Sequence, residues 1–381
     1  IIKFMNSNNI NLSVIKHDLF GGLTAAVVAL PLALAFGVSS GLGALSGLYG
    51  AIFVGFFASF FGGTPKQISG PTGPMTVIVG IIFIEFNYRP EPVFFCIMLS
   101  GVFQILFGII KLGSIVKYIP MPVVSGFMTG IGLIIIFLQL PVLLGLGNET
   151  TVILSLAKLT NFFSFNKEAW IIGSFCLISL FLIPSKINKI IPSPIIILFL
   201  GTLTTFLFFN DLELIGSIPT GIPKMILFLP ETHEFLKIIF YAFLLALLGI
   251  IDSLLTSIIA DKITNDVHKP NKETIGQGIG NFFSGLFGGL AGAGATMRTV
   301  VNIKAGGKTK FSGITHSILL LLIVLVFSPV AEIIPLSVLA AILIKVGVDI
   351  VDWDFFKKFS TQPIRDRCIT LFVIVLTVFV N

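Results

Sequence analysis

The stretch Gly50–Thr76 reads GAIFVGFFASFFGGTPKQISGPTGPMT, and a second stretch, Gly276–Thr299, reads GQGIGNFFSGLFGGLAGAGATMRT. Each begins as a Gly-rich apolar segment that ends in Phe-Gly-Gly, and each continues through small residues into a short apolar run. Ser69–Pro74 and Gly292–Thr296 are too rich in Gly or Pro to continue a helix. The pattern therefore predicts two interrupted helices, each followed by a short helix.

The composition places these interrupted helices in a membrane. Hydrophobic residues make up 55% of the 381 residues, charged residues make up 11%, and the mean hydropathy is +1.05. Soluble domains carry about 25% charged residues, so this chain has too few charges to cover a water-exposed surface. The composition predicts an all-α polytopic membrane protein and excludes a soluble enzyme or a nucleic-acid-binding protein.

Apolar runs separated by charges, Pro or Asn predict thirteen membrane spans. Two of them, 71–86 and 295–305, are short. If both cross the membrane, most of the 24 Lys and Arg residues lie on the same side of the membrane as the N-terminus. The positive-inside rule then puts the N-terminus in the cytoplasm. The predicted spans are 19–39, 42–62, 71–86, 92–110, 121–145, 169–184, 192–209, 236–260, 274–290, 295–305, 312–331, 335–351 and 367–381.

The two related stretches are seven spans apart, and an odd offset reverses the orientation of the second stretch. This spacing predicts an inverted-topology repeat of seven plus seven spans. The N-terminus of each short helix would lie near the membrane midplane, where its free N–H groups and partial positive charge suit an anion. Thr72, Thr76, Thr296 and Thr299 would add hydroxyl donors. In the alternative interpretation, the glycines only permit close helix packing.

Three ionisable residues, Asp252, Arg298 and Lys345, lie inside apolar spans. A charged side chain is costly inside a membrane, so each of these residues is a candidate for a functional role. Thr256 follows Asp252 by four residues and shares its helix face, so the two oxygens suit a hard cation such as Na⁺. Arg298 could add positive charge beside the anion, or it could pair with Asp252 in a purely structural role. Lys345 lies near the predicted inner end of its span and can extend toward water.

Five motifs in this order resemble the SulP family of inorganic anion transporters, and in particular its cyanobacterial sodium-dependent bicarbonate transporters. The resemblance covers essentially the whole chain. The motifs are ALPLALAFG at Ala29–Gly37, GGTPKQISGPTGPM at Gly62–Met75, DSLLTS at Asp252–Ser257, GQGIGN at Gly276–Asn281 and GAGATMR at Gly292–Arg298.

The resemblance implies a core domain of about 18–113 and 236–332 and a gate domain of about 120–210 and 335–381. It also implies a homodimer in which the core domain carries the substrate by an elevator-type movement. The resemblance places the anion between the two short helices, at Thr72, and we predict an anion site of Thr72, Gly73, Ala295, Thr296 and Arg298, although the bicarbonate transporters tend to have a small residue in place of Arg298. The implied Na⁺ site comprises Asp252, Thr256, Gly294, Ala295 and Thr296.

A fourteenth span and a cytoplasmic STAS domain, which the resemblance also implies, are not in this sequence, so we expect it to be part of a longer chain. The sequence offers no nucleophile–base pair, metal cluster or phosphate-binding loop, which favours a transporter over an enzyme and requires no cofactor.

We expect a multi-pass plasma (inner) membrane protein that couples Na⁺ to bicarbonate uptake. A sulfate permease or an anion exchanger, proton-coupled or uncoupled, is an alternative because other SulP members carry Arg at the position of Arg298. An anion channel is a further alternative.

Overall fold

The fold is taken from a computed structural model, which describes residues 12–114, 120–147, 151–160, 165–188, 192–209, 211–216, 225–226, 228 and 230–379. Residues 1–11, which carry the predicted cytoplasmic N-terminus, lie outside the described residues. The same is true of short pieces of the predicted gate domain at 148–150, 161–164, 189–191, 210 and 380–381.

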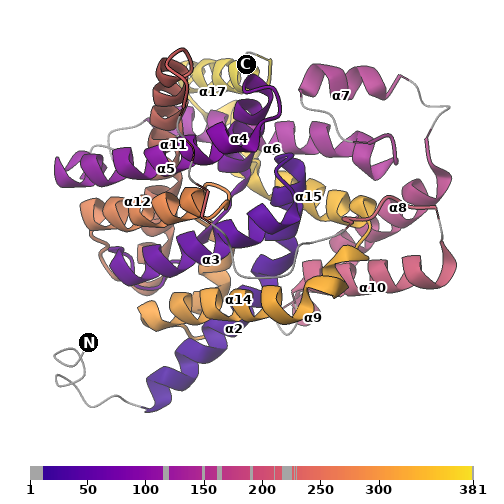
Figure 1. Ribbon diagram of the computed structural model, residues 1–381, viewed down its shortest axis with the longest axis horizontal. Helices are drawn as coiled ribbons and strands as arrows, with labels where there is room; N and C mark the ends of the chain where they lie inside the picture. The colour runs from indigo at the N-terminus through magenta and orange to yellow at the C-terminus, as the bar shows by residue number, and fades with distance from the viewer. Residues whose placement is uncertain are drawn as a thin grey trace.

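The described residues form a helical protein, as predicted (Figure 1). Two strands of two residues each also pair into a sheet, which was not predicted. Every predicted span coincides with a helix, and the ends agree to within about four residues except at the start of the first helix, which begins at Leu12 and not at residue 19. The elements in the first part of the chain are α2 (Leu12–Ser39), α3 (Ala44–Phe61), β1 (Ser69–Gly70), α4 (Gly73–Glu85), α5 (Pro90–Ile109), α6 (Met121–Leu143), α7 (Val152–Lys158), α8 (Lys167–Leu182), α9 (Ser185–Asn188) and α10 (Ser193–Phe208). Those in the second part are α11 (Phe235–Thr264), α12 (Pro270–Leu286), β2 (Ala293–Gly294), α13 (Thr296–Lys304), α14 (Lys310–Glu332), α15 (Leu336–Ile350), α16 (Trp353–Lys357), η3 (Phe359–Thr361) and α17 (Ile364–Phe379).

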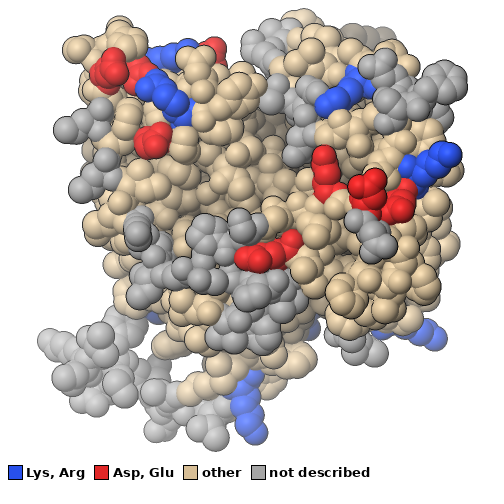
Figure 2. Space-filling model, turned by 45° about the vertical axis from the view of Figure 1, so that its right-hand side comes forward, with Lys and Arg blue, Asp and Glu red and all other residues tan. Residues whose placement is uncertain are grey.

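The apolar helices have the length and surface of membrane spans. Among the described residues, α2, α3, α5, α6 and α11 are long and apolar enough to cross a bilayer, and α4 and α10 are shorter apolar helices. Large apolar side chains are exposed on α8 and α10, including Leu182, Phe206 and Phe208, each with more than 70% of its surface accessible. Most of the surface in Figure 2 is uncharged. Such a large exposed apolar surface is unfavourable in water, so a lipid environment accounts for it.

The helices pack in two groups. In the first group, α12 packs against α3 and α5, α14 packs against α2 and α3, and α11 packs against α5. In the second group, α6 packs against α15 and α17, and α8 packs against α10 and α15. In Figure 1, α3, α5 and α12 lie on the left and α8 and α10 lie on the right. This grouping supports the predicted core and gate domains, whose boundaries stay a prediction.

The packing pairs are those that a seven-span repeat would generate. The repeat relates α2 to α11, α3 to α12, α5 to α14, α6 to α15 and α8 to α17. Accordingly, the α5–α12 contact has its counterpart in α3–α14, the α2–α14 contact in α5–α11, and the α6–α17 contact in α8–α15. The inverted repeat stays a prediction that these pairs support.

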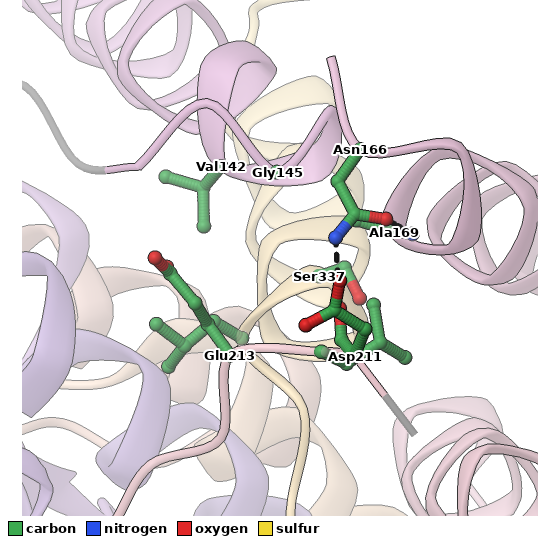
Figure 3. A pocket seen from close by; sticks show the side chains of 9 residues that line it. Val142, Gly145, Asn166, Ala169, Asp211, Glu213 and Ser337 are labelled. Carbon is green, nitrogen blue, oxygen red and sulfur yellow. Dashed lines mark hydrogen bonds between the residues drawn. The ribbon is translucent and has the colours of Figure 1, made fainter. Parts of the chain in front are cut away.

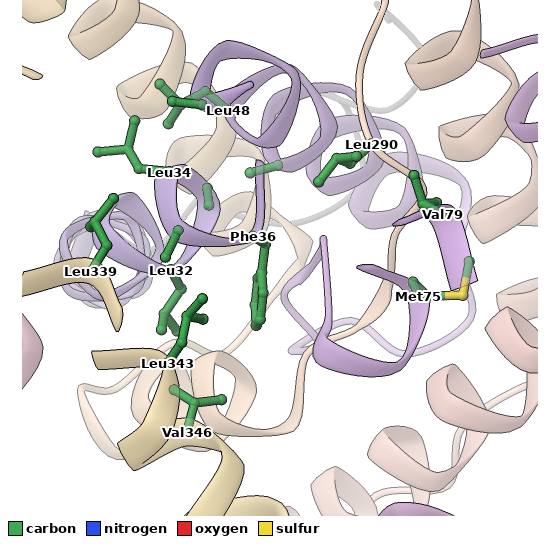
Figure 4. Packing of buried hydrophobic residues seen from close by; sticks show 14 of the residues in the cluster. Leu32, Leu34, Phe36, Leu48, Met75, Val79, Leu290, Leu339, Leu343 and Val346 are labelled. Carbon is green, nitrogen blue, oxygen red and sulfur yellow. The ribbon is translucent and has the colours of Figure 1, made fainter. Parts of the chain in front are cut away.

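Apolar side chains fill the boundary between the two groups. Leu32 and Phe36 of α2 are buried in one cluster with Leu339 and Leu343 of α15 (Figure 4). Met75 of α4 belongs to the same cluster and is fully buried. The start of α4 thus lies between the two groups, with α11 on one side and α6 on the other.

Candidate functional site

The two interrupted stretches meet in the structure. β1 and β2 pair antiparallel, with Ser69 opposite Gly294 and Gly70 opposite Ala293. The Ala295 amide extends the pairing by donating to the Ile68 carbonyl at 2.8 Å. Backbone that leaves a helix inside a membrane needs hydrogen-bond partners, and the two strands supply them to each other. The pairing also brings the N-termini of α4 and α13 together.

Glycine makes this close approach possible. A Cβ built on Gly292 would lie 2.6 Å from the carbonyl carbon of Gly70, which is closer than side chains approach a backbone. Asn281 of α12 holds Gly292 in place, because its side-chain amide donates to the Gly292 carbonyl at 2.9 Å and its oxygen accepts from the Gly292 N–H at 2.8 Å. The broken backbone is therefore fixed by both its partner strand and a neighbouring helix.

Each short helix starts beside a residue with extended backbone. α4 starts at Gly73 after Thr72, and α13 starts at Thr296 after Ala295. The side chains of Thr72 and Thr296 do not cap their own helices. First-turn amides of a helix lack intrahelical acceptors and carry partial positive charge. The two helix starts can therefore stabilise an anion that lies between them.

The predicted cation ligands are connected to both helix starts. Thr72 Oγ1 donates to Asp252 Oδ2 at 2.7 Å. Thr256 Oγ1 donates to the Gly294 carbonyl at 2.8 Å and lies 2.7 Å from Thr296 Oγ1. Asp252 and Thr256 are buried on one face of α11, as their spacing predicts. The structure thus joins five predicted site residues in two hydrogen-bonded sets, Thr72 with Asp252, and Thr256 with Gly294 and Thr296.

The other predicted site residues are placed differently. Gly73 and Ala295 occupy the first helical position of α4 and the N-cap of α13, where they contribute backbone groups. Arg298 is 1% exposed, and its Nη2 donates to the Pro71 carbonyl at 3.2 Å. Asp252 and Arg298 are both described, and no ion pair joins them. Arg298 thus contacts the backbone next to β1, and its Nη1 has no hydrogen-bond partner in the part of the chain that the structure describes.

A buried polar network, which the sequence reasoning missed, supports β1 from behind. The Glu273 carboxylate of α12 is 1% exposed and accepts four N–H groups. Oε2 accepts from the amides of Gly63 and Thr64, each at 2.8 Å. Oε1 accepts from Gln67 Nε2 at 2.9 Å and Gln277 Nε2 at 2.8 Å. These bonds fix the segment that leads from α3 into β1.

A pattern in the sequence could have revealed this network. Glu273, Gln277 and Asn281 are spaced by four residues and therefore share one face of α12. All three are buried. Buried polar side chains need hydrogen-bond partners, so a buried polar stripe on a helix indicates such partners on the neighbouring segments. Ser253 and Ser257 on α11 continue the network, since Ser253 Oγ accepts from the Gly294 amide at 3.0 Å and Ser257 Oγ donates to Gln67 Oε1 at 2.9 Å.

Two cavities in the described part of the chain bear on the site. One, of about 270 Å³, lies between α6, α8 and α15, with Asp211, Glu213 and Ser337 in its wall (Figure 3). None of the predicted site residues lines it. The other, of about 250 Å³, is lined by the first residues of α10, parts of α8 and α15, and Met297, the second residue of α13. The second cavity is therefore the one next to the paired helix starts.

The fold and the site together define a polytopic membrane protein with two half-helices that meet end to end, the arrangement of a secondary transporter. The model of the Sulfate permease family matches residues 15–373. The chain therefore belongs to this family of anion transporters, which confirms the SulP resemblance.

Its relatives include the bicarbonate transporter BicA of Picosynechococcus sp., which is 46% identical over 98% of this chain and 69% of its own length. BicA of Synechocystis sp. is 45% identical over 98% of this chain and 68% of its own length. A putative sulfate transporter of Bacillus subtilis, YvdB, is 36% identical over 88% of this chain and 65% of its own length. Among solved structures, the transmembrane domain of a cyanobacterial BicA superposes with a TM-score of 0.91 at 44% identity, covering 98% of this chain and 97% of that domain.

Proposed function

We propose that this chain carries bicarbonate across the plasma membrane together with Na⁺. The observation that carries the proposal is the hydrogen-bonded junction at the two helix starts. There Asp252 and Thr256 of α11 contact Thr72, Gly294 and Thr296. The relatives named as bicarbonate transporters support bicarbonate as the anion.

The donor set fits a hard cation. The hydrogen bond from Thr72 engages Oδ2 of Asp252 and leaves Oδ1 for a ligand. The hydroxyl oxygens of Thr256 and Thr296 and the carbonyl of Gly294 lie at the same junction. Oxygen ligands with one carboxylate suit Na⁺. A cation at Asp252 and an anion at the helix starts would each favour binding of the other through Coulomb attraction in a water-poor cavity.

The arrangement of the helices supports elevator-type movement. All predicted anion and cation residues lie on α4, α11, α13 and the strands, whereas α6, α8, α10, α15 and α17 form the second packed group. The first group would carry the site along the second. We infer a homodimer with a cytoplasmic N-terminus from the family resemblance, and cross-linking in native membranes tests the dimer.

The test is uptake of labelled bicarbonate and labelled sulfate by proteoliposomes, with and without a Na⁺ gradient. Wild type should take up bicarbonate faster with Na⁺, and Asp252→Asn should remove the difference. Asp261→Asn is the matched control, because Asp261 lies on the same helix and contacts His268 in the loop instead. Wild-type uptake that is the same with and without Na⁺, or a stimulation by Na⁺ that persists in Asp252→Asn, would end the coupling proposal.

Sulfate is the second candidate substrate. The fully buried guanidinium of Arg298, with Nη1 unpartnered, adds a positive charge close to the helix starts, and YvdB is named as a putative sulfate transporter. If sulfate is the substrate, the uptake assay will show sulfate competing with bicarbonate, and Arg298→Gln will abolish sulfate uptake. Anion currents that far exceed carrier turnover would instead identify a channel.

A further inference from the structure

The cavity of about 250 Å³ lies between the two packed groups of helices. Met297 of α13 contributes one wall, and α8, α10 and α15 contribute the others. The charged residues among those that line it are Lys345 and Asp349 of α15. The rest of the lining is mainly apolar, including Phe181, Ile342 and Val346. A cavity of this size has room for a small oxyanion and several waters.

The cavity opens next to the anion site. Met297 is 40% exposed, and Thr296, which precedes it, is partly exposed. In contrast, Thr72 and Asp252 are each less than 10% exposed. The start of α13 is therefore accessible on the side where the cavity lies, whereas the start of α4 is buried. An anion that approaches the site from this side passes the residues of α15.

Lys345 is held over the cavity by two contacts. Its ammonium group pairs with Asp349 one helical turn later, and it lies 5.1 Å from the centre of the Phe181 ring. The Lys345 side chain is 22% exposed and that of Asp349 is 40% exposed. A lysine in a mainly apolar helix is costly in a membrane, and its presence at a water-accessible cavity marks an ion pathway. Asp349 makes the pair neutral overall and leaves the lysine able to exchange one anionic partner for another.

We propose that this cavity is a second anion-binding position, at which Lys345 binds the transported oxyanion before it reaches the helix starts. Asp349 is the internal competitor that the oxyanion displaces. A permeation pathway needs such intermediate positions to bind an ion weakly enough for it to leave, and a competing carboxylate limits the affinity in this way. The proposal rests on the proposed transport function and adds a second position to it.

Kinetics of uptake test the proposal, because the two charges act in opposite directions. Lys345→Gln should raise the KM for bicarbonate roughly ten-fold at low ionic strength, because it leaves the Asp349 carboxylate as the only charge among the lining residues, and a cleft lined by one sign of charge changes the local ion concentration by about ten-fold or more. Asp349→Asn should lower the KM, because the competitor is gone. Both effects should shrink when an impermeant salt raises the ionic strength, because salt screens partly exposed charges. Lys345→Arg should restore a KM close to that of wild type.

The matched controls are Lys357→Gln and Asp354→Asn. These residues form an ion pair one turn apart on α16, are largely exposed and do not line the cavity, so their substitution should leave KM unchanged. An unchanged KM in Lys345→Gln would overturn the proposal. A fall in kcat that does not respond to ionic strength would also overturn it, because it would indicate that Lys345 only contributes to helix packing. If wild type takes up bicarbonate while the Lys345 and Asp349 variants match the controls, only this proposal fails. If wild type takes up no anion, the proposed function fails and this proposal fails with it.

Discussion

Glu273 offers the most direct test of how the broken backbone is supported. It is buried with no cationic partner among the described residues, and its two carboxylate oxygens accept four N–H groups from two segments, residues 63–67 and α12. Two of these donors are the amides of Gly63 and Thr64, which follow α3 and have no helix of their own to bond to. We therefore expect Glu273 to fix the segment from residue 63 to β1, and through it the position of α4.

The size of the effect follows from counting donors. In Glu273→Ala, the amides of Gly63 and Thr64 and the side chain of Gln67 lose their acceptor, whereas Gln277 keeps Ser69 Oγ at 2.6 Å. Each buried donor without a partner costs about 1–3 kcal/mol, so the three together cost about 3–9 kcal/mol. Native proteins are stable by only about 5–15 kcal/mol. Glu273→Ala should therefore remove much of the stability of the fold.

Glu273→Gln isolates the charge and the acceptor pattern from the volume. The new amide keeps one oxygen, which can serve either the backbone pair or the glutamine pair of donors. Its NH₂ group then faces the other pair, and two hydrogen bonds to a charged acceptor are lost at about 1.5–3 kcal/mol each. The expected loss is about 3–6 kcal/mol, close to that of the alanine variant although no cavity is created.

The assay is the temperature at which detergent-solubilised protein loses its monodisperse peak in size-exclusion chromatography. Glu91→Gln is the control, because Glu91 lies in the first turn of α5, as Glu273 lies in the first turn of α12, but is exposed. Exposed substitutions of this kind change stability by about 0.5 kcal/mol or less. The reasoning is refuted if Glu273→Gln and Glu91→Gln have the same transition temperature.

Three further substitutions test other parts of the junction. Thr72→Val removes the hydroxyl that donates to Asp252. A hydrogen bond to a charged group contributes about 1.5–3 kcal/mol, so we expect at least a ten-fold change in the Na⁺ concentration that half-saturates uptake. Asn281→Ala leaves both backbone groups of Gly292 without their side-chain partner, so hydrogen–deuterium exchange at this amide should accelerate while exchange in α8 stays the same. Gly70→Ala places a Cβ 2.6 Å from a buried guanidinium nitrogen, and we expect loss of uptake with the protein still inserted in the membrane; normal uptake would contradict the described β1–β2 junction.

Much of the fold was predictable because membrane helices are specified by local composition. Apolar length and helix-breaking residues set the ends of each span, and the predicted spans coincide with the helices of the structure. The same Gly and Pro residues located the two breaks, since no neighbouring structure can make Ser69–Pro74 a regular helix. Prediction succeeded wherever a segment's own residues decide its conformation.

The site was less predictable because side-chain contacts depend on the tertiary arrangement. The spacing of Asp252 and Thr256 placed both on one face of α11, but it could not state that one would meet Thr72 and the other Thr296. The partner of Arg298 is a carbonyl next to β1, and a backbone partner leaves no signature in the sequence. The spacing of residues within one helix could be read from the sequence, whereas contacts between side chains of different helices had to be observed in the structure.

The support of the junction bears on how the site can move. The side chains that hold β1 and β2 come from α11 and α12, through Ser253, Asn281 and Glu273, and these helices belong to the first packed group. The second group meets the junction at Gly73, where a Cβ would lie 2.6 Å from the side chain of Ile135 on α6. Hydrogen bonds thus fasten the site to the first group, while its contact with α6 at Ile135 is apolar. A hydrogen bond from Gln139 of α6 to Ser39 of α2 also joins the two groups, so the proposed movement of the site along α6 and α15 should break this bond and leave the bonds within the site intact.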